Sequence, residues 1–498
     1  MAFKRSAVRS RLAPQKTHLI VSFLFSLNIT PKNFNPKLLS LFLLAMNLLP
    51  INSYYKKILR VALPAIAGLS TQMVVSLVDS AMVGRLDEAT YALAAMGIGV
   101  LATWALVSFF SSLATGTHVI VARRFGQGNF LECGNTLNNS LILSLLIGGV
   151  VAAIGASLAG PIAHFFASDD VVGDYASQYL FYRFLGIPFF LISVSYRGFF
   201  FGISKTKIFM ISGILTNLFN VIFNYMFIYG SFGLPRMGLA GAGLGSTLAT
   251  FSDVVFYLII ILLPAYRNKF QNFRHFKIDK EIIRGIYKIS LPVSFQNVFV
   301  LIGFLSFVAI TGIIGTKEQA ATQAIISTLF ISFLPLFGFG IAVQTLVGNN
   351  LGAGKYHLAK LYGFETAKVA TIYTIFLGII FISIPQYVLN IITNDWSIIE
   401  LAKSSLRIAG FAQIFYATGV VLANGLQAAG RTVFVMKAEM LTNLFIFVPL
   451  AYLLGVVFDF GLTGAWFALP GYIIIYSSLI FYKYNSADWH KDIPVKLD

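Results

Sequence analysis

The chain has 498 residues, of which 57% are hydrophobic and 11% are charged. A soluble globular chain carries roughly 25% charged residues, so the composition excludes that class and predicts a polytopic membrane protein. The net charge is +17. The basic residues lie between apolar runs, which is typical of orientation signals and headgroup contacts and not of a nucleic-acid-binding surface. The single cysteine, Cys133, excludes an intramolecular disulfide and a multi-cysteine metal site.

Residues 1–49 differ in composition from the rest of the chain. They begin with a basic stretch, continue with a short apolar run at 19–27 and are then interrupted by Pro31 and Pro36. A basic segment before an apolar run is typical of a targeting peptide, but no clear small-residue cleavage site follows. A true start at Met46 is a second interpretation. We favour a third, a variable and poorly ordered N-terminal extension.

Apolar runs of about 20 residues or more alternate with short polar breaks through the rest of the chain. Backbone groups need hydrogen-bond partners in lipid, so each run is predicted to be a helix. The expected fold is therefore an all-α polytopic membrane protein. We predict twelve transmembrane helices, at residues 57–83, 91–121, 135–166, 175–203, 207–230, 238–264, 286–314, 320–349, 359–392, 398–428, 432–455 and 461–484.

The loops between these helices alternate in charge. If the N-terminus is inside, the inner loops hold most lysines and arginines, including Arg124, Lys205 and Lys355, while acids such as Asp87 and Asp169 fall in outer loops. The positive-inside rule then predicts that both termini are cytoplasmic.

The two halves of the chain also resemble each other. Four motifs recur in the same order at offsets of 223 to 228 residues. The pairs begin at Ala62 and Ser290, at Arg124 and Asn350, at Leu215 and Leu441, and at Gly238 and Gly461. Six helices per repeat is an even number, so both halves enter the membrane from the same side and are related by a pseudo-twofold axis along the membrane normal.

This repeat divides the chain into two lobes with a central cavity expected between them. The predicted parts are the extension at 1–49, an N-lobe at 50–265, a basic cytoplasmic linker at 266–285, a C-lobe at 286–485 and a cytoplasmic tail at 486–498.

Asp79 is the only carboxylate in the long apolar run at 58–83. A charge at membrane depth costs roughly 2.5–3.5 kcal/mol, and such residues commonly face a cavity on an ion or substrate path. The alternative is that Asp79 lies near the end of its helix and reaches interfacial water. Gln72 lies seven residues before Asp79 and shares its helical face.

A second polar stripe lies on the fifth predicted helix. Asn217, Asn220 and Asn224 are spaced three and four apart and share one face. Such a stripe needs partners, either on another helix or in a wet cavity with Asp79.

On the sixth predicted helix, Ser246 and Thr247 are expected to complete the cluster around Asp79. Asp253 lies seven residues after Ser246, so it falls on the same stripe. It is either a second functional acid or a partner for another group in the lobe interior.

The motifs resemble those of the MATE (multidrug and toxic compound extrusion) family, most closely its DinF-like branch. The first is Leu77-Val-Asp79-Ser-Ala-Met-Val-Gly84 after Ala62-Leu-Pro64, and the second is Gln344-Thr-Leu-Val-Gly-Asn-Asn-Leu-Gly352-Ala-Gly354. Arg124-Phe-Gly-Gln-Gly128 is the first-half counterpart of the second motif. The resemblance covers about residues 55–485 and implies export of organic, often cationic or amphipathic compounds, driven by inward flow of protons or Na⁺.

The resemblance also implies roles for single residues. Asp79 stands at the position of the coupling carboxylate, and Ser246 at that of a hydroxyl on the sixth helix. The branch carries Asn-x-x-x-Asp on the fifth helix, whereas this chain has Asn220-Val-Ile-Phe-Asn224, so the second acid is missing. Arg183 matches a basic position of the branch and is expected to pair with an outer-half carboxylate or with carbonyls.

The NorM-like branch places acids on helices 7 and 10, and this chain has none near Val300 or Ala417. We therefore expect coupling at Asp79: protonation from outside removes its charge and lets the first helix repack while substrate is released. Na⁺ is the rival ion, because carboxylate, amide and hydroxyl oxygens suit it.

A lipid-linked sugar flippase of the same wider superfamily is the alternative, but such proteins usually have additional helices or a strongly cationic cavity. An intramembrane enzyme would need a metal motif, paired aspartates or a nucleophile with a base, and we find none. We expect a monomer in the bacterial inner membrane with no cofactor besides the coupling ion.

Overall fold

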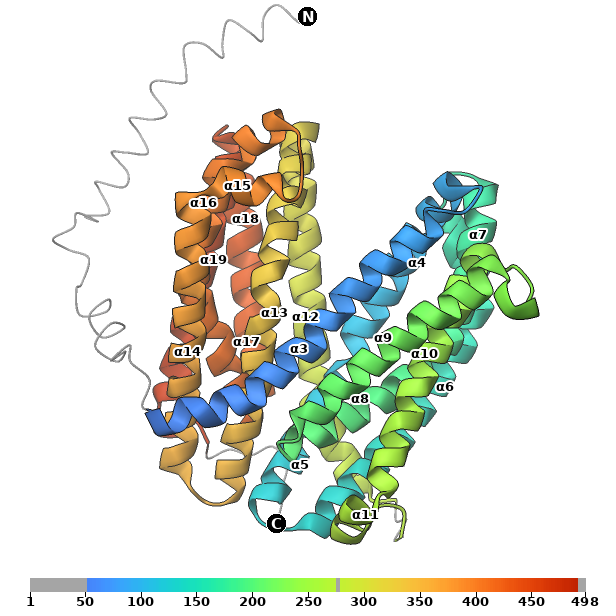
Figure 1. Ribbon diagram of the computed structural model, residues 1–498. Helices are drawn as coiled ribbons and strands as arrows, with labels where there is room; N and C mark the ends of the chain where they lie inside the picture. Colours follow the sequence, from blue (N-terminus) through green and yellow to red (C-terminus); the bar gives the residue numbers. More distant parts are fainter. Residues whose placement is uncertain (1–51, 275–277, 491–498) are drawn as a thin grey trace, which may run out of the picture.

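The computed structural model describes residues 52–274 and 278–490 (Figure 1). Within these ranges every regular element is helical, which confirms the predicted all-α class. Eleven of the described helices are long and apolar enough to cross a membrane, and one bent pair supplies a twelfth span. The extension predicted at 1–49 and the last residues of the tail lie outside the described ranges.

The first half of the chain contributes six spans. They are α3 (Asn52–Val83), α4 (Ala89–Phe110) with α5 (Ser112–Gly126), α6 (Phe130–Phe166), α7 (Asp170–Leu185) with α8 (Ile187–Gly202), α9 (Thr206–Tyr229) and α10 (Gly238–Leu262). A single 3-10 turn, η1 (Ser231–Gly233), joins α9 to α10, and the short helix α11 (Pro264–Phe270) follows α10.

The second half repeats this order. Its elements are α12 (Lys280–Ile314), α13 (Thr316–Gly352), α14 (Tyr356–Ser383) with the short α15 (Pro385–Asn390), α16 (Trp396–Ala428), α17 (Thr432–Thr442) continued by η2 (Asn443–Phe447), α18 (Val448–Tyr452) and η3 (Leu453–Val457), and α19 (Gly461–Asn485). The residues predicted as a linker include part of α11 and the first turns of α12.

Local sequence explains where several helices begin. Asp169, Asp279 and Asp395 each precede a helix, and each carboxylate accepts hydrogen bonds from backbone N–H groups of the first turn. These N-caps satisfy donors that have no partner within the helix.

Two predicted spans are broken by their sequence. The span predicted at 175–203 consists of α7 and α8, which meet at Gly186 and are bent by 43°. A Cβ at Gly186 would lie 2.6 Å from the hydroxyl of Thr247, and Pro188 follows in the first turn of α8. The span predicted at 359–392 ends at Ser383, because Pro385 disfavours helical geometry at the residue before it.

The ribbons of the two halves converge at the end that holds α11 and separate toward the opposite end (Figure 1). At the convergent end a Cβ on Gly126 would lie 2.0 Å from the carbonyl oxygen of Asn349, and one on Gly352 would lie 2.0 Å from that of Arg123. Both pairs are related by the 226-residue repeat, so the contact is reciprocal, as a pseudo-twofold axis requires.

Helix α3 connects the two halves physically. It crosses obliquely between them in Figure 1 and packs against α13 in the second half and α9 in the first. Ile58, Val61 and Ala62 near its beginning are buried in the hydrophobic core of the second half. Farther along α3, Gly68 lets Phe209 of α9 approach closely. A displacement of α3 therefore affects both halves.

Candidate functional site

Asp79 lies in the last turns of α3 and faces α9. Its carboxylate accepts a hydrogen bond of 2.7 Å from the side-chain amide of Asn224. Asp79 is part-buried, whereas Asn224 is fully buried. The residue predicted as the main coupling group is thus brought against the predicted asparagine stripe.

The contact continues into α9 and α10 as a chain of polar side chains. The Nδ2 of Asn224 also lies 3.2 Å from the amide oxygen of Asn220, which is one helical turn away. The Nδ2 of Asn220 in turn donates to the hydroxyl of Ser246 at 3.2 Å. Three helices therefore bring together the four residues predicted for ion coupling, which we call the Asp79 cluster: Asp79, Asn220, Asn224 and Ser246.

Close packing of α9 against α10 limits the shape of this cluster. A Cβ at Gly245 would lie 2.3 Å from the amide oxygen of Asn224 and 2.9 Å from its backbone nitrogen. Glycine at this position is therefore required for the observed position of Asn224. The amide oxygen is buried and accepts no hydrogen bond in the described structure.

Arg183 on α7 places a positive charge near the Asp79 cluster. Its guanidinium interacts electrostatically with Asp79 and with the hydroxyl of Tyr179, one turn earlier on α7. Among the described residues no ion pair within 4.0 Å joins Arg183 to Asp79, and the buried Nε has no hydrogen-bond partner. The sequence did not predict Tyr179 near the site, although its spacing of four from Arg183 places it on the same helical face.

The other predicted residues lie farther from the cluster. Gln72 is exposed on α3, and the Thr247 hydroxyl donates to the carbonyl of Tyr182 at 2.7 Å and not to Asp79. Asn217 is part-buried, and its Nδ2 makes no hydrogen bond. Gln72 lies seven residues before Asp79, roughly 10 Å along the helix axis, whereas Asn217 lies one turn before Asn220 but makes no hydrogen bond to it through Nδ2.

Asp253 belongs to a different polar group. Its buried carboxylate accepts hydrogen bonds from Ser193 and, at 3.0 Å, from Thr216, and it forms an ion pair of 3.3 Å with Arg197. Arg197 also lies over the ring of Phe209, 5.3 Å from its centre. These three partners belong to α8 and α9, and none of them is a member of the Asp79 cluster.

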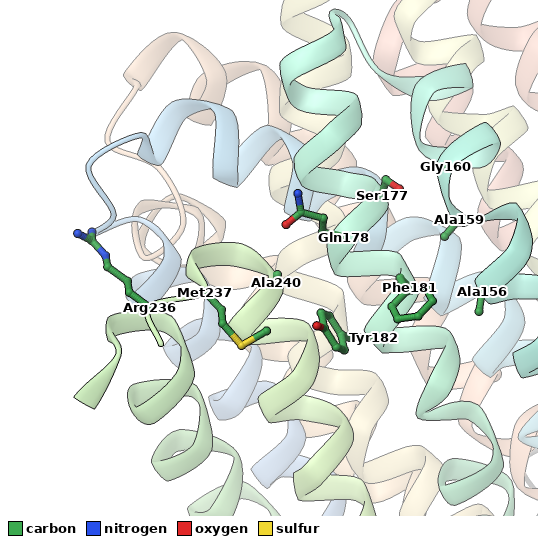
Figure 2. A pocket seen from close by; sticks show the side chains of 10 residues that line it. All are labelled: Ala156, Ala159, Gly160, Ser177, Gln178, Phe181, Tyr182, Arg236, Met237 and Ala240. Carbon is green, nitrogen blue, oxygen red and sulfur yellow. The ribbon is translucent and has the colours of Figure 1, made fainter. Parts of the chain in front are cut away.

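A cavity of about 550 Å³ lies between α6, α7 and the beginning of α10 (Figure 2). Its lining is mixed: Ser177, Gln178, Tyr182 and Arg236 are the polar members, and the rest are alanines, Gly160, Phe181 and Met237. Arg236 lies at the end remote from Ala156 in Figure 2, and it pairs with Asp87 at 2.7 Å. Asp79 is not among the residues that line this cavity.

Within the described residues, twelve spans in two related halves, with a part-buried carboxylate and buried amides inside one half, define a polytopic protein built like a secondary transporter. The chain belongs to the MatE family, because the family model matches residues 64–226 and 292–453. One matched segment falls in each half, which agrees with the internal repeat.

Relatives cover nearly the full described chain. A probable multidrug resistance protein NorM of Thermotoga maritima is 27% identical over 445 residues, which cover 88% of this chain and 93% of that protein. A protein of the same name from Bacillus thuringiensis subsp. konkukian is 27% identical over 430 residues, covering 84% of this chain and 93% of the relative.

Solved structures share the fold. A MOP superfamily transporter from Pyrococcus furiosus superposes with a TM-score of 0.78 at 19% identity, covering 88% of this chain and 97% of the other. A multidrug resistance MATE family transporter in an outward-facing conformation gives a TM-score of 0.79 at 19% identity, covering 86% of this chain and 94% of the other.

Proposed function

We propose that the protein is a secondary active multidrug efflux transporter that exports organic, often cationic or amphipathic compounds by cation-coupled antiport. The observation that carries the proposal is the hydrogen bond from Asn224 to Asp79 within a chain of the MatE family. The names of the relatives support efflux over the alternative of a lipid-linked sugar flippase.

The proposed mechanism starts from the charged state of Asp79. In that state the amide of Asn224 donates to the carboxylate, and the charge of Arg183 attracts it. A proton arriving from outside neutralises Asp79 and removes this attraction, so the end of α3 is free to repack against α9. Because α3 also packs against α13, the movement reaches the contact between the halves.

Na⁺ is the second candidate for the coupling ion. The cluster offers the carboxylate of Asp79, the hydroxyl of Ser246 and the amide oxygens of Asn220 and Asn224, and oxygen ligands of this kind suit hard cations. The amide oxygen of Asn224 has no hydrogen-bond partner and is therefore available as a ligand. Placing coupling in the first half is the DinF-like arrangement, and it stays part of the proposal.

We further propose that the convergent end is cytoplasmic and that the protein is a monomer in the bacterial inner membrane. Ser204 and Asn349, which are hydrogen-bonded at 2.9 Å, bring the loop before α9 to the contact between the halves. The basic residues Lys205, Lys207 and Lys355 flank that contact in the sequence. The positive-inside rule supports this orientation, with both termini inside and the diverging ends outside.

The test uses purified protein in liposomes loaded with ethidium as the probe. Proton and Na⁺ gradients are imposed separately, and efflux is followed by fluorescence for the wild type and for Asp79→Asn. We expect one of the two gradients to drive ethidium efflux by the wild type. The efflux rate of Asp79→Asn is expected to fall to that of loaded liposomes without protein, although the variant still binds ethidium. Unchanged gradient-driven efflux by Asp79→Asn would exclude Asp79 as the coupling group.

A further inference from the structure

The second half contains a buried carboxylate that the proposed mechanism does not use. Glu439 on α17 is 3% exposed. It accepts a hydrogen bond of 2.5 Å from the hydroxyl of Tyr472 on α19 and a long one of 3.5 Å from the amide of Asn443. No described lysine, arginine or histidine forms an ion pair with it. A lone charge at this depth costs roughly 2.5–3.5 kcal/mol, so the carboxyl requires a cation or a proton.

The groups around Glu439 are aromatic and tightly packed. Two further tyrosines, the part-buried Tyr416 and the buried Tyr476, interact with it electrostatically, and Tyr472 stacks on Tyr476 with ring centres 6.0 Å apart. The ring of Phe447 packs on that of Tyr472, with ring centres 5.4 Å apart. An organic cation would need space among these rings, whereas a proton needs none. The surroundings therefore favour a proton as the occupant.

Asn443 offers a buried acceptor to a protonated Glu439. Its amide oxygen is buried and accepts no hydrogen bond, and a Cβ at Gly303 of α12 would lie 1.6 Å from that oxygen. A carboxylate offers no donor, but a carboxylic acid has one O–H. Protonated Glu439 can donate to Asn443, after rotation of the amide, and still accept from Tyr472 through its other oxygen.

The repeat relates this group to the Asp79 cluster. At the offset of 226 residues, Glu439 corresponds to Gly213 and Asn443 to Asn217, so α17 is the counterpart of α9. Phe307 stands at the position of Asp79 at the offset of 228. The second half thus carries its acid on the α9 counterpart, and this helix continues at Asn443 as the π-helical turn η2, a geometry frequent at functional sites.

We propose that Glu439 is a second proton-carrying site, which holds a proton in the conformation seen here and releases it when the second half repacks. The step forms an O–H bond on the Glu439 carboxylate with a proton taken from water and breaks the same bond on release. The titratable groups that face it are Tyr416, Tyr472 and Tyr476. Lys437 is exposed and two residues away, so it does not share this face.

The inference rests on the proposed antiport, and the experiment separates the two. Ethidium is added to the purified protein in weakly buffered detergent, and a pH dye reports the number of protons released per protein molecule. This number is the proton count. Glu439→Gln is expected to halve the count relative to the wild type, and Asp79→Asn to halve it independently. Glu365→Gln is the matched control, since Glu365 is equally buried in the same half but pairs with Lys368 at 2.7 Å; its count is expected to stay unchanged.

A proton count that stays unchanged in Glu439→Gln overturns the second site, whatever the result for Asp79→Asn. A proton count that stays unchanged only in Asp79→Asn overturns Asp79 as the coupling group and leaves the second site standing. Infrared difference spectra keep the test valid if Glu439→Gln does not fold. In Asp79→Asn protein titrated from mildly acidic to mildly alkaline pH, a buried carboxyl band that disappears supports the inference. A carboxyl that stays protonated or charged throughout overturns it.

Discussion

The side-chain amide of Asn224 donates a 2.7 Å hydrogen bond to Asp79, while its own oxygen accepts none. The nitrogen is also within 3.2 Å of Asn220, so a single amide group links α3 to the rest of the polar chain on α9 and α10. This dependence on one residue makes Asn224 the most informative position in the cluster after Asp79 itself.

Asn224→Ala removes the donor to Asp79 and separates Asp79 from Asn220 and Ser246. A hydrogen bond to a charged group contributes about 1.5–3 kcal/mol, so gradient-driven ethidium efflux is expected to fall by about tenfold or more. Efflux is measured in liposomes at equal protein content. Asn217→Ala is the matched control, because the same side chain on the same helix makes no hydrogen bond through Nδ2. Equal losses in both variants would contradict a specific role for Asn224.

Much of the architecture follows from the sequence, because apolar runs of spanning length dictate helices in lipid. The meeting of Asp79 with Asn224 was also predictable: an isolated acid and an amide stripe on apolar helices both need partners. The bend at Gly186 was not predictable from hydropathy, since the apolar run continues across it and the bend depends on contact with Thr247. The hydrogen-bond partners of Thr247 and Asp253 likewise lie on neighbouring helices that helical spacing does not reveal.

Gly245→Ala is expected to destabilise the protein and to disturb the cluster together. The added Cβ would lie 2.3 Å from the Asn224 amide oxygen and 3.1 Å from the backbone carbon of Phe223, so α9 must shift. Overpacking of this kind costs about 1–3 kcal/mol, which thermal unfolding in detergent measures. Gly149→Ala on α6 has no atom within 4 Å of its new Cβ and serves as the control. If the unfolding temperature falls equally in Gly245→Ala and Gly149→Ala, close packing at Gly245 is not what limits stability.

Gly352→Ala tests the reciprocal contact between the halves. Its Cβ would lie 2.0 Å from the carbonyl oxygen of Arg123, so the convergent ends are expected to separate. Spin labels attached through Lys205→Cys and Lys355→Cys would report a longer distance in this variant. Cys133 is buried and does not compete for the label. Gly97→Ala, with no atom within 4 Å of the added Cβ, is expected to leave the distance unchanged. An unchanged distance in Gly352→Ala would show that the contact does not hold the ends together.

The pair of Asp253 and Arg197 should act through stability and not through coupling. Asp253 is almost fully buried and its ion pair with Arg197 measures 3.3 Å, so removing one partner leaves a buried charge uncompensated. Arg197→Met is expected to cost about 3–5 kcal/mol of unfolding free energy, and the double variant with Asp253→Asn to recover most of it. Ethidium efflux per folded molecule should be retained in the double variant, because Asp79 and its amide partners are untouched. A double variant that folds normally but has lost gradient-driven efflux would instead assign Asp253 to the coupling site, as the acid that replaces the one missing at Asn224.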